Sequence, residues 1–247
     1  GRLTSTSTLA AALGQRVGVP LVPIRISTVG FARWHVSVGQ PIPPGPSIES
    51  TTAHINRELE NQIRQNPADW LWTHNRWKTP PFGFLFTANR QQTHLPPGSD
   101  FSQLIPFRIL VSSVDEPEEA RLAAPAVRAI KRGRPEARVS ILTPEALATF
   151  WLDVVEVDEV LAFADGESFS HIVTRIRKAG KFDVGILLSD NPMAAKAMVV
   201  AGIPARLGSP RRKGLTHWQN PAGVSEPPAR GGDRYRRIAN AAGAEVF

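Results

Sequence analysis

From residue 107 onward, apolar and polar positions alternate in a way that predicts strands separated by helices. Residues 107–111 form an apolar run rich in β-forming side chains, and a polar turn follows it. Ala123, Val127 and Ile130 then recur at the spacing of one helix face, and residues 139–142 restart an apolar strand. This order predicts a βαβ unit over residues 107–142.

The alternation continues to residue 207 and sets the fold class. Four or more β-α alternations predict an α/β fold with a parallel, doubly wound sheet. Ligands bind such sheets at the carboxyl ends of the strands, so residues 112–119 are the first place to look for chemistry. The further predicted strands are 160–163, 184–188 and 205–207, and the further predicted helices are 143 or 144 to 151, 168 or 170 to 180, and 192–200.

The first 78 residues follow a different pattern. A short helix is predicted at residues 6–16 and is stopped by Gly18. A hairpin is then predicted with strands at 21–28 and 33–38 and its turn at Val29-Gly30, and the second strand alternates strictly. This part of the chain therefore lacks the repeated β-α order of the second part.

A longer helix is predicted after the hairpin. Thr51 or Thr52 is expected to cap it, and apolar residues recur every four positions until Pro67 ends it. A further turn of helix is predicted at 68–78, and the residues after it are rich in proline, glycine and glutamine. The predicted organisation is a first domain at 1–78, a linker at 79–106 and a second domain at 107–247.

Composition narrows the classes of function. The 247 residues are 42% hydrophobic and 21% charged, which is ordinary for globular domains. The absence of cysteine excludes disulfides, thiolate metal sites and a cysteine nucleophile. A net charge of +7 favours polyanionic partners, which are nucleic acid, anionic lipid or a phosphorylated sugar. Dinucleotide, P-loop, serine-hydrolase and metal-spaced histidine motifs are absent from the sequence, which argues against those chemistries.

Two segments of the first domain resemble a known family. LGQRVGVPLVPIRIS and INRELENQIRQNPADWLWTHNRWK resemble the C-terminal half of the lipid A late acyltransferases, the lauroyl and myristoyl transferases of the lysophospholipid acyltransferase superfamily. The resemblance implies that Arg2 ends a segment lining the active site. It also implies that His74, Arg76 and Lys78 of the closing motif contact acyl carrier protein or lipid phosphate, and a purely structural role for that motif stays open.

The catalytic dyad of that family is not found in this sequence. The resemblance implies a His-x4-Asp or His-x4-Glu pair, in which the carboxylate orients an imidazole that deprotonates the acceptor hydroxyl. The residues five positions after the six histidines are Gln40, Leu59, Thr79, Ser99, Ile176 and Ala222. We therefore expect the dyad upstream of Gly1, in a longer protein, and expect residues 1–78 alone to be inactive.

The second domain resembles another family of the same pathway. RILVSS, AAPAVRAIKRGRPEARVSILTPEALATFW, VDEVLAFADG, FDVGILLSDNPMAAKAMVVAGIPARLG and RYRRIANAAGA resemble the N-terminal half of the ADP-heptose:lipopolysaccharide heptosyltransferases, glycosyltransferase family nine. The likeness runs from residue 108 to about residue 244. It implies a Rossmann-like domain of the GT-B N-terminal type that holds the acceptor, with the nucleotide-sugar bound mainly by a further domain.

The loop after the first strand departs from that family. The family pattern implies a Gly-Asp pair whose Asp is the general base for the acceptor hydroxyl, and the matching positions here are Glu118 and Glu119. The resemblance thus implies Glu119 as the catalytic base, with Ser112, Ser113 and Glu118 as acceptor-binding residues. The alternative is a solvated acidic cluster, because acidic side chains at a helix N-terminus are sufficiently explained by the helix dipole.

The two resemblances together give one functional hypothesis. The chain is expected to be a fragment of a bifunctional lipopolysaccharide transferase that transfers an acyl chain to a lipid A precursor and heptose to the inner core. Expected substrates are acyl carrier protein or CoA thioesters and ADP-heptose, with no cofactor and no metal. Expected partners are the lipid A precursor, acyl carrier protein, the nucleotide-sugar and an anionic membrane surface, at the cytoplasmic face of the inner membrane.

Two other hypotheses stay open. In the first, the second domain is a degenerate, non-catalytic module that binds lipid A or core sugars for the acyltransferase. In the second, the protein binds nucleic acid, which only the net charge suggests. No basic helix with interleaved aromatic residues or other reader motif is present in the sequence.

Overall fold

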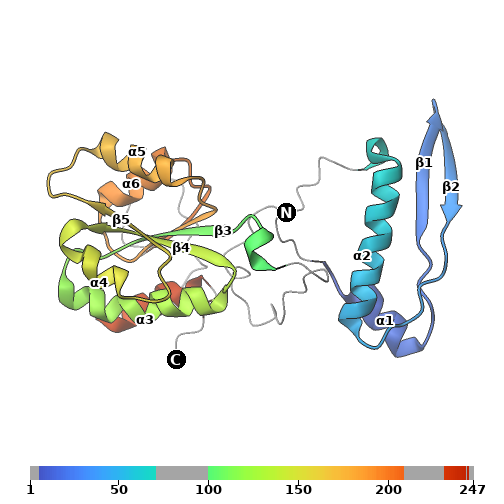
Figure 1. The fold of residues 1–247 in the computed structure, drawn as a ribbon, viewed down its shortest axis with the longest axis horizontal. Coiled ribbons are helices and arrows are strands. Elements are labelled where there is room, and N and C mark those ends of the chain that lie inside the picture. The colour runs from blue at the N-terminus through green and yellow to red at the C-terminus, as the bar shows by residue number, and fades with distance from the viewer. Residues whose placement is uncertain (1–5, 71–99, 209–230, 243, 245–247) are drawn as a thin grey trace, which may run out of the picture. The chain divides into compact units, whose positions relative to one another are not determined.

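The computed structural model describes residues 6–70, 100–208, 231–242 and 244. These residues form two compact units, which we describe separately (Figure 1). Most of the predicted linker lies outside the described residues, as do four predicted site residues, Arg2, His74, Arg76 and Lys78. Within the described ranges, no helix is both long and apolar enough to cross a membrane.

The first unit begins with helix α1 (Leu9–Val17), which ends at Gly18 as predicted. Gly18 adopts the left-handed conformation with φ of 71°, which a glycine reaches without steric cost. Helix α2 (Ile48–Gln65) ends just before a short 3-10 turn (Pro67–Asp69), so the predicted stop is confirmed. The predicted helical turn at 68–78 lies largely outside the described residues.

The predicted cap of α2 is wrong. Ser47 caps the helix, and its hydroxyl accepts a hydrogen bond from the Ser50 backbone N–H at 3.1 Å. The Ser50 hydroxyl accepts one from the Ser47 N–H at 3.2 Å, which completes a capping box. Thr51 and Thr52 lie within the first turns, where their hydroxyls donate back to backbone carbonyls. The helix starts four or five residues earlier than predicted because this reciprocal pair satisfies two N–H groups at once.

Strands β1 (Ile24–Gly30) and β2 (Arg33–Val38) form the predicted antiparallel hairpin. The predicted turn at Val29-Gly30 is wrong, because β1 continues to Gly30 and the chain reverses at Phe31-Ala32. The register shifts between Thr28 and Gly30, and Ala32 has a φ of 52°. The irregularity leaves Val29 as one extra, unpaired residue in β1, and the turn lies two positions further along the chain than predicted.

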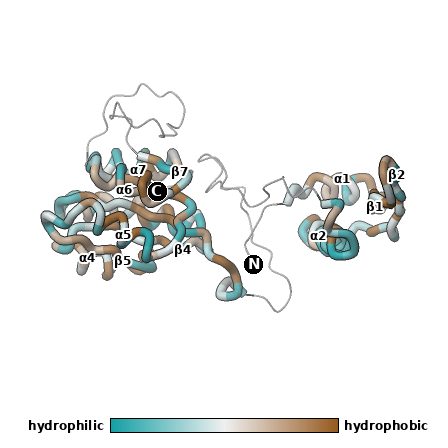
Figure 2. Tube along the Cα trace, turned by 90° about the horizontal axis from the view of Figure 1, so that it is seen from above, coloured by the Kyte–Doolittle hydropathy of each residue, from teal (hydrophilic) through white to brown (hydrophobic). Residues whose placement is uncertain are grey.

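The hairpin turns its polar side to α2 and leaves its apolar side open. The Arg25 guanidinium donates to the Gln65 amide of α2. The opposite side carries Ile24, Ile26, Trp34, Val36 and Val38, with 57–69% of each residue exposed and no cover among the described residues. Figure 2 shows the contrast between the largely hydrophilic α2 and the hydrophobic positions of β2.

We expect this apolar surface to bind a hydrophobic dye. Contiguous exposed apolar patches bind apolar partners or promote self-association. The double variant Ile26→Thr with Val36→Thr should lower the fluorescence of bound anilinonaphthalene sulfonate, since threonine keeps the β-branched shape of the strands. Ser37→Thr on the other side of the hairpin is the control. Equal fluorescence for the double variant and the control would contradict the expectation.

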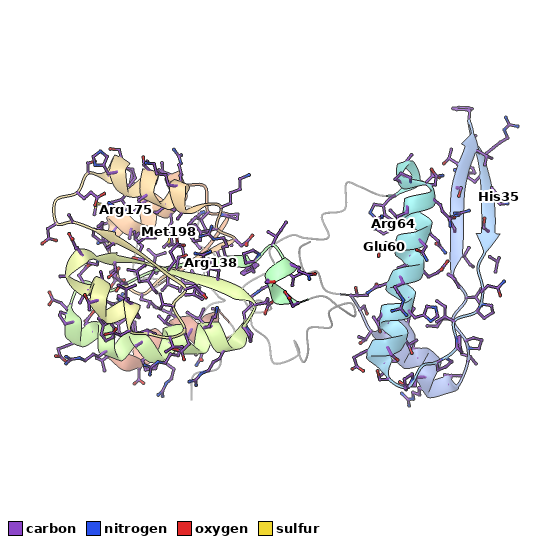
Figure 3. The ribbon with its side chains drawn as sticks, viewed as in Figure 1. His35, Glu60, Arg64, Arg138, Arg175 and Met198 are labelled. Atoms are coloured by element: carbon purple, nitrogen blue, oxygen red, sulfur yellow. The ribbon has the colours of Figure 1, made fainter. Side chains whose placement is uncertain are left out.

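Helix α2 carries an ion pair between its own side chains. Arg64 and Glu60, four residues apart, form an ion pair at 2.6 Å, and Figure 3 shows both on this helix. The pair is well exposed, so its contribution is only about 0.3–0.5 kcal/mol. The apolar side chains every four positions along α2 are half-buried rather than enclosed.

The second unit is built on a five-stranded parallel sheet. Its order is β5-β4-β3-β6-β7, so the chain winds outward in one direction from β3 and then in the other from β6. The predicted α/β class with a doubly wound, Rossmann-like sheet is therefore confirmed. The strands are β3 (Phe107–Ser112), β4 (Ala137–Pro144), β5 (Glu159–Phe163), β6 (Val184–Leu187) and β7 (Ala205–Leu207).

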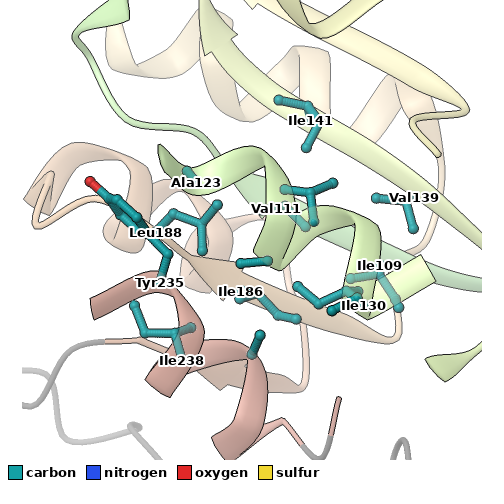
Figure 4. Close-up of a cluster of buried hydrophobic side chains, with 14 of the residues drawn as sticks. Ile109, Val111, Ala123, Ile130, Val139, Ile141, Ile186, Leu188, Tyr235 and Ile238 are labelled. Carbon is teal, nitrogen blue, oxygen red and sulfur yellow. The ribbon is translucent and has the colours of Figure 1, made fainter. Parts of the chain in front are cut away.

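Helices cover both faces of this sheet (Figure 1). One core cluster joins the sheet to three helices, α3 (Pro117–Gly133), α4 (Ala148–Leu152) and α7 (Gly232–Ala241). The other joins it to two, α5 (Phe169–Ala179) and α6 (Pro192–Val200). In Figure 4, Ile109, Val111 and Ile186 of the sheet lie in the cluster with Ile130 of α3 and Ile238 of α7.

Two local predictions for this unit need correction. The helix before Trp151 does not open at residue 143 or 144, because β4 runs to Pro144, which pairs with Phe163 of β5. A 3-10 turn and α4 follow that pairing. The basic residues at 206 and 211–213 predict a solvated loop or a contact with phosphates, but Arg206 is only 8% exposed in β7, and its guanidinium donates to the Ile203 carbonyl. Burial lowers the pKa of Arg206 from its usual value.

Candidate functional site

The candidate site lies at the carboxyl ends of β3 and β6. The strand order of the sheet reverses between these two neighbouring strands, so the loops that follow them lead to opposite faces of the sheet. Two backbone hydrogen bonds order the edge: Leu188 N–H to the Ser112 carbonyl at 3.1 Å, and Ser113 N–H to the Leu142 carbonyl at 2.8 Å. The predicted residues 112–119 begin at this edge.

Ser112 and Ser113 are at the predicted edge but are only 3% and 2% exposed. The Ser113 hydroxyl accepts a hydrogen bond from the Trp151 indole N–H at 2.8 Å and donates to the Val114 carbonyl at 3.0 Å. The Ser112 hydroxyl has the Ser113 carbonyl at 3.5 Å. Their partners inside the protein explain both serines structurally, and acceptor binding by them stays a prediction.

Glu118 belongs to the first turn of α3, whose first residue is Pro117. Its side chain is 81% exposed and forms an ion pair with Arg121 at 2.7 Å, three residues further along the helix. Pro117 suits the first helical position because its fixed φ matches the helix. The acidic first turn also complements the helix dipole, so the structural explanation of Glu118 is sufficient without an acceptor.

Glu119 stands apart from the other acidic residues through its contact with α7. The Tyr235 hydroxyl donates a hydrogen bond to Glu119 Oε2 at 2.8 Å, across 116 residues of sequence. Tyr235 is 1% exposed, and Figure 4 shows its ring in the cluster that includes Ala123 and Leu188. Burial raises the pKa of Tyr235, and the hydrogen bond and charge of Glu119 raise it further. The phenol therefore stays protonated and remains a donor.

The preceding residue of α7 reaches the other loop of the site. Arg234 Nη2 lies 2.7 Å from Asp190 Oδ1, in the loop after β6. Beside Asp190, the Asn191 side chain accepts hydrogen bonds from the Met193 and Ala194 N–H groups and caps α6. Two consecutive residues of α7, Tyr235 and Arg234, thus contact the N-terminal regions of α3 and α6, the helices that follow β3 and β6.

Sequence reasoning missed this contribution of α7. The arginines at 230, 234, 236 and 237 predict the polar face of a terminal helix, whereas the Arg234 side chain is 24% exposed and paired. The available signal was Tyr235, the single tyrosine of the chain, within an otherwise arginine-rich segment.

The arrangement suits proton transfer by a carboxylate. One oxygen of Glu119 is held by a buried donor, and no other hydrogen bond to this carboxylate is found in the described part of the chain. Across the same residues, no group of three or more metal-ligating side chains comes together. A carboxylate fixed at one oxygen and open at the other can accept a proton from a hydroxyl placed against it.

Thr143 carries another buried hydroxyl near the site, at the end of β4. It is fully buried, and its Oγ1 has no hydrogen-bond partner among the described residues. Because an unpaired buried hydroxyl is costly, we expect Thr143→Val to raise the free energy of unfolding by about 1 kcal/mol, measured by denaturant unfolding.

Ser140 provides the matched control for that prediction. It is buried on the same strand, but its hydroxyl donates to Glu159 Oε2 at 2.7 Å. Ser140→Ala should lower the free energy of unfolding by about 1.5–3 kcal/mol, the range for hydrogen bonds to charged groups. Destabilisation by Thr143→Val would contradict the assignment of an unpaired hydroxyl.

Comparisons with known proteins find one matching family model and several similar solved structures. Residues 1–79 match the family model of the bacterial lipid A biosynthesis acyltransferases. No curated protein matches the chain. Similar solved structures include heptosyltransferases, and the doubly wound topology described above defines the fold class independently of them.

Three of these solved structures give the extent of the likeness. ADP-heptose lipopolysaccharide heptosyltransferase II of E. coli is 22% identical, with a TM-score of 0.37, over 41% of this chain and 30% of that chain. A family 9 glycosyltransferase of Veillonella parvula is 17% identical, with a TM-score of 0.46, over 56% and 42%. E. coli heptosyltransferase WaaC with ADP is 12% identical, with a TM-score of 0.46, over 57% and 49%. The chain thus spans less than half the length of each structure.

Proposed function

We propose that the chain is part of a lipopolysaccharide biosynthesis transferase with two activities. The observation that carries the proposal is the match of residues 1–79 to the lipid A acyltransferase family, followed in one chain by a doubly wound domain. The first part contributes to acyl transfer to a lipid A precursor. The second holds the sugar acceptor for heptosyl transfer to the inner core.

In the second activity, Glu119 acts as the general base. The acceptor hydroxyl binds against the open oxygen of the carboxylate, and its oxygen attacks the anomeric carbon of ADP-heptose. As the new glycosidic bond forms, the bond to the diphosphate breaks and ADP leaves with the electron pair. Glu119 takes the hydroxyl proton, which balances the step. The placement of this carboxylate beside the reversal of strand order supports the role.

The substrates and setting follow from the same proposal. The acyl donor is an acyl carrier protein or CoA thioester, and the sugar donor is ADP-heptose, bound mainly by a further domain. The protein works at the cytoplasmic face of the inner membrane, where its net charge of +7 favours contact with anionic lipid. Arg2, His74, Arg76 and Lys78 are proposed to serve the acyl-transfer part.

A second candidate function is supported by a specific observation. Glu118 and Glu119 stand where the family pattern implies Gly-Asp, and the exposed Glu118 adds bulk and charge beside the acceptor position. In this alternative the second unit binds lipid A or core sugars without catalysis and holds the acyltransferase near its substrate.

The experiment separates the two activities in the full-length protein. Acyl transfer is measured with acyl carrier protein thioester and a lipid A precursor, and heptosyl transfer with ADP-heptose and a lipid A acceptor carrying the inner-core sugar. The proposal expects both reactions. Acyl transfer without heptosyl transfer, with acceptor binding intact, would support the binding module instead.

A further inference from the structure

We infer that Tyr235 is a positioning residue that fixes the Glu119 carboxylate for proton transfer. The inference rests on the proposed heptosyl transfer. It adds Tyr235, which is not needed to propose Glu119 as the general base. Its basis is the 2.8 Å hydrogen bond from the Tyr235 hydroxyl to Glu119 Oε2. A residue of α7 thereby acts on a carboxylate of α3.

The two partners differ in how firmly they are held. The Tyr235 ring is 1% exposed within the core cluster, so its position is set by packing on every side. Glu119 is exposed, and a free glutamate at the first turn of a helix would move among several rotamers. A donor fixed by the core limits that motion, because it favours the rotamers that keep Oε2 within hydrogen-bond distance.

The geometry leaves the reactive oxygen available. Tyr235 engages Oε2 only, and no second partner of this carboxylate is found in the part of the chain that the structure describes. Since burial raises the pKa of Tyr235, the phenol stays a donor and does not compete for the proton that Glu119 accepts. Tyr235 therefore holds one carboxylate oxygen, Oε2, and the other oxygen remains available to accept the proton.

Arg234 fixes the helix that carries Tyr235. Its ion pair with Asp190 ties the first turn of α7 to the loop after β6, and its guanidinium carbon lies 5.9 Å from the centre of the Tyr235 ring. The Arg234 Nε is buried and has no hydrogen-bond partner among the described residues, so the ion pair is its main restraint. Asp190, Arg234 and Glu119 are the charged groups that act on the Tyr235 hydroxyl.

The test compares Tyr235→Phe with a packing control in the full-length protein. Tyr235→Phe keeps the ring and removes only the hydroxyl, and Ile238→Val trims another buried side chain of α7. The inference expects Tyr235→Phe to lower kcat for heptosyl transfer about tenfold with KM for ADP-heptose unchanged, because a misplaced catalytic group loses rate rather than binding. Ile238→Val is expected to retain the wild-type kcat.

A double-mutant comparison separates positioning from structure. In a Glu119→Gln background there is no base to position, so adding Tyr235→Phe should cause no further loss of rate. An unchanged kcat for Tyr235→Phe beside an inactive Glu119→Gln would overturn the inference and leave the proposed function standing. An equal loss in Ile238→Val would assign the effect to packing and also overturn it. Absence of heptosyl transfer by the wild type would reject the proposed function, and the inference with it.

Discussion

Glu119→Gln is expected to lower the rate of heptosyl transfer by about 10²–10⁴-fold, the usual contribution of a general base. Glutamine has nearly the same shape, and its carbonyl oxygen can still accept the hydrogen bond from Tyr235. The substitution thus removes proton acceptance and retains the local packing. The measurement is acceptor-dependent release of ADP from ADP-heptose by the full-length protein.

Glu116→Gln is the matched control for this loss. Glu116 precedes α3 in the same acidic segment, is exposed, and makes no side-chain capping hydrogen bond. We expect the rate of heptosyl transfer by Glu116→Gln to stay within about twofold of wild type, since changes at exposed sites without special contacts have small effects. A wild-type rate for Glu119→Gln, or an equal loss in both variants, would contradict the role of Glu119.

Trp151→Ala is expected to lower the free energy of unfolding of the second unit by about 3–5 kcal/mol, as for other large buried aromatic residues. Trp151 is fully buried and packs edge-to-face on Phe150, with ring centroids 5.1 Å apart. Its indole also donates to the Ser113 hydroxyl at the end of β3. The substitution therefore opens a cavity and removes a hydrogen bond at the edge that carries the site.

Trp151→Phe tests which part of that cost is packing. It keeps most of the aromatic volume and loses the indole N–H, so we expect a cost of about 1–3 kcal/mol. Denaturant unfolding followed by far-ultraviolet circular dichroism measures all variants by the same signal. A cost below about 1 kcal/mol for Trp151→Ala would show that this region does not hold the unit together.

Local signals in the sequence were sufficient for much of the second unit. Helix α6 and strand β7 have the predicted bounds, because Pro192 starts the helix and Gly202 separates it from the strand. Ser168, one of the two predicted starts, caps α5, and the helix ends before Gly180 as predicted. These start and stop signals act on the backbone within a few residues, so they can be found without knowledge of the fold.

The errors arose where distant residues decided the structure. Pro144 appeared to open a helix, but its pairing with Phe163 extends β4. Arg206 appeared to belong to a basic loop, but it pairs with Gly185 of β6 within the sheet. In both cases the deciding partner lies on a neighbouring strand, which periodicity along the chain does not reveal.

The candidate site likewise combines a residue that the local sequence predicted with partners that it did not predict. The sequence placed Glu119 at the start of a helix near the carboxyl ends of the strands, and the structure has it there. Its partner Tyr235 lies 116 residues away, and Asp190 joins through a third segment. No local pattern links these residues, because the connection depends on how α7 packs against α3.

The central claim is that the second unit is the acceptor half of a working glycosyltransferase. The most direct measurement is transfer of heptose from ADP-heptose to a lipid A acceptor by the full-length wild-type protein, with acceptor binding measured in parallel. The account predicts a glycosylated product and an equal amount of ADP. Acceptor binding without any product would contradict it and leave a binding module attached to an acyltransferase.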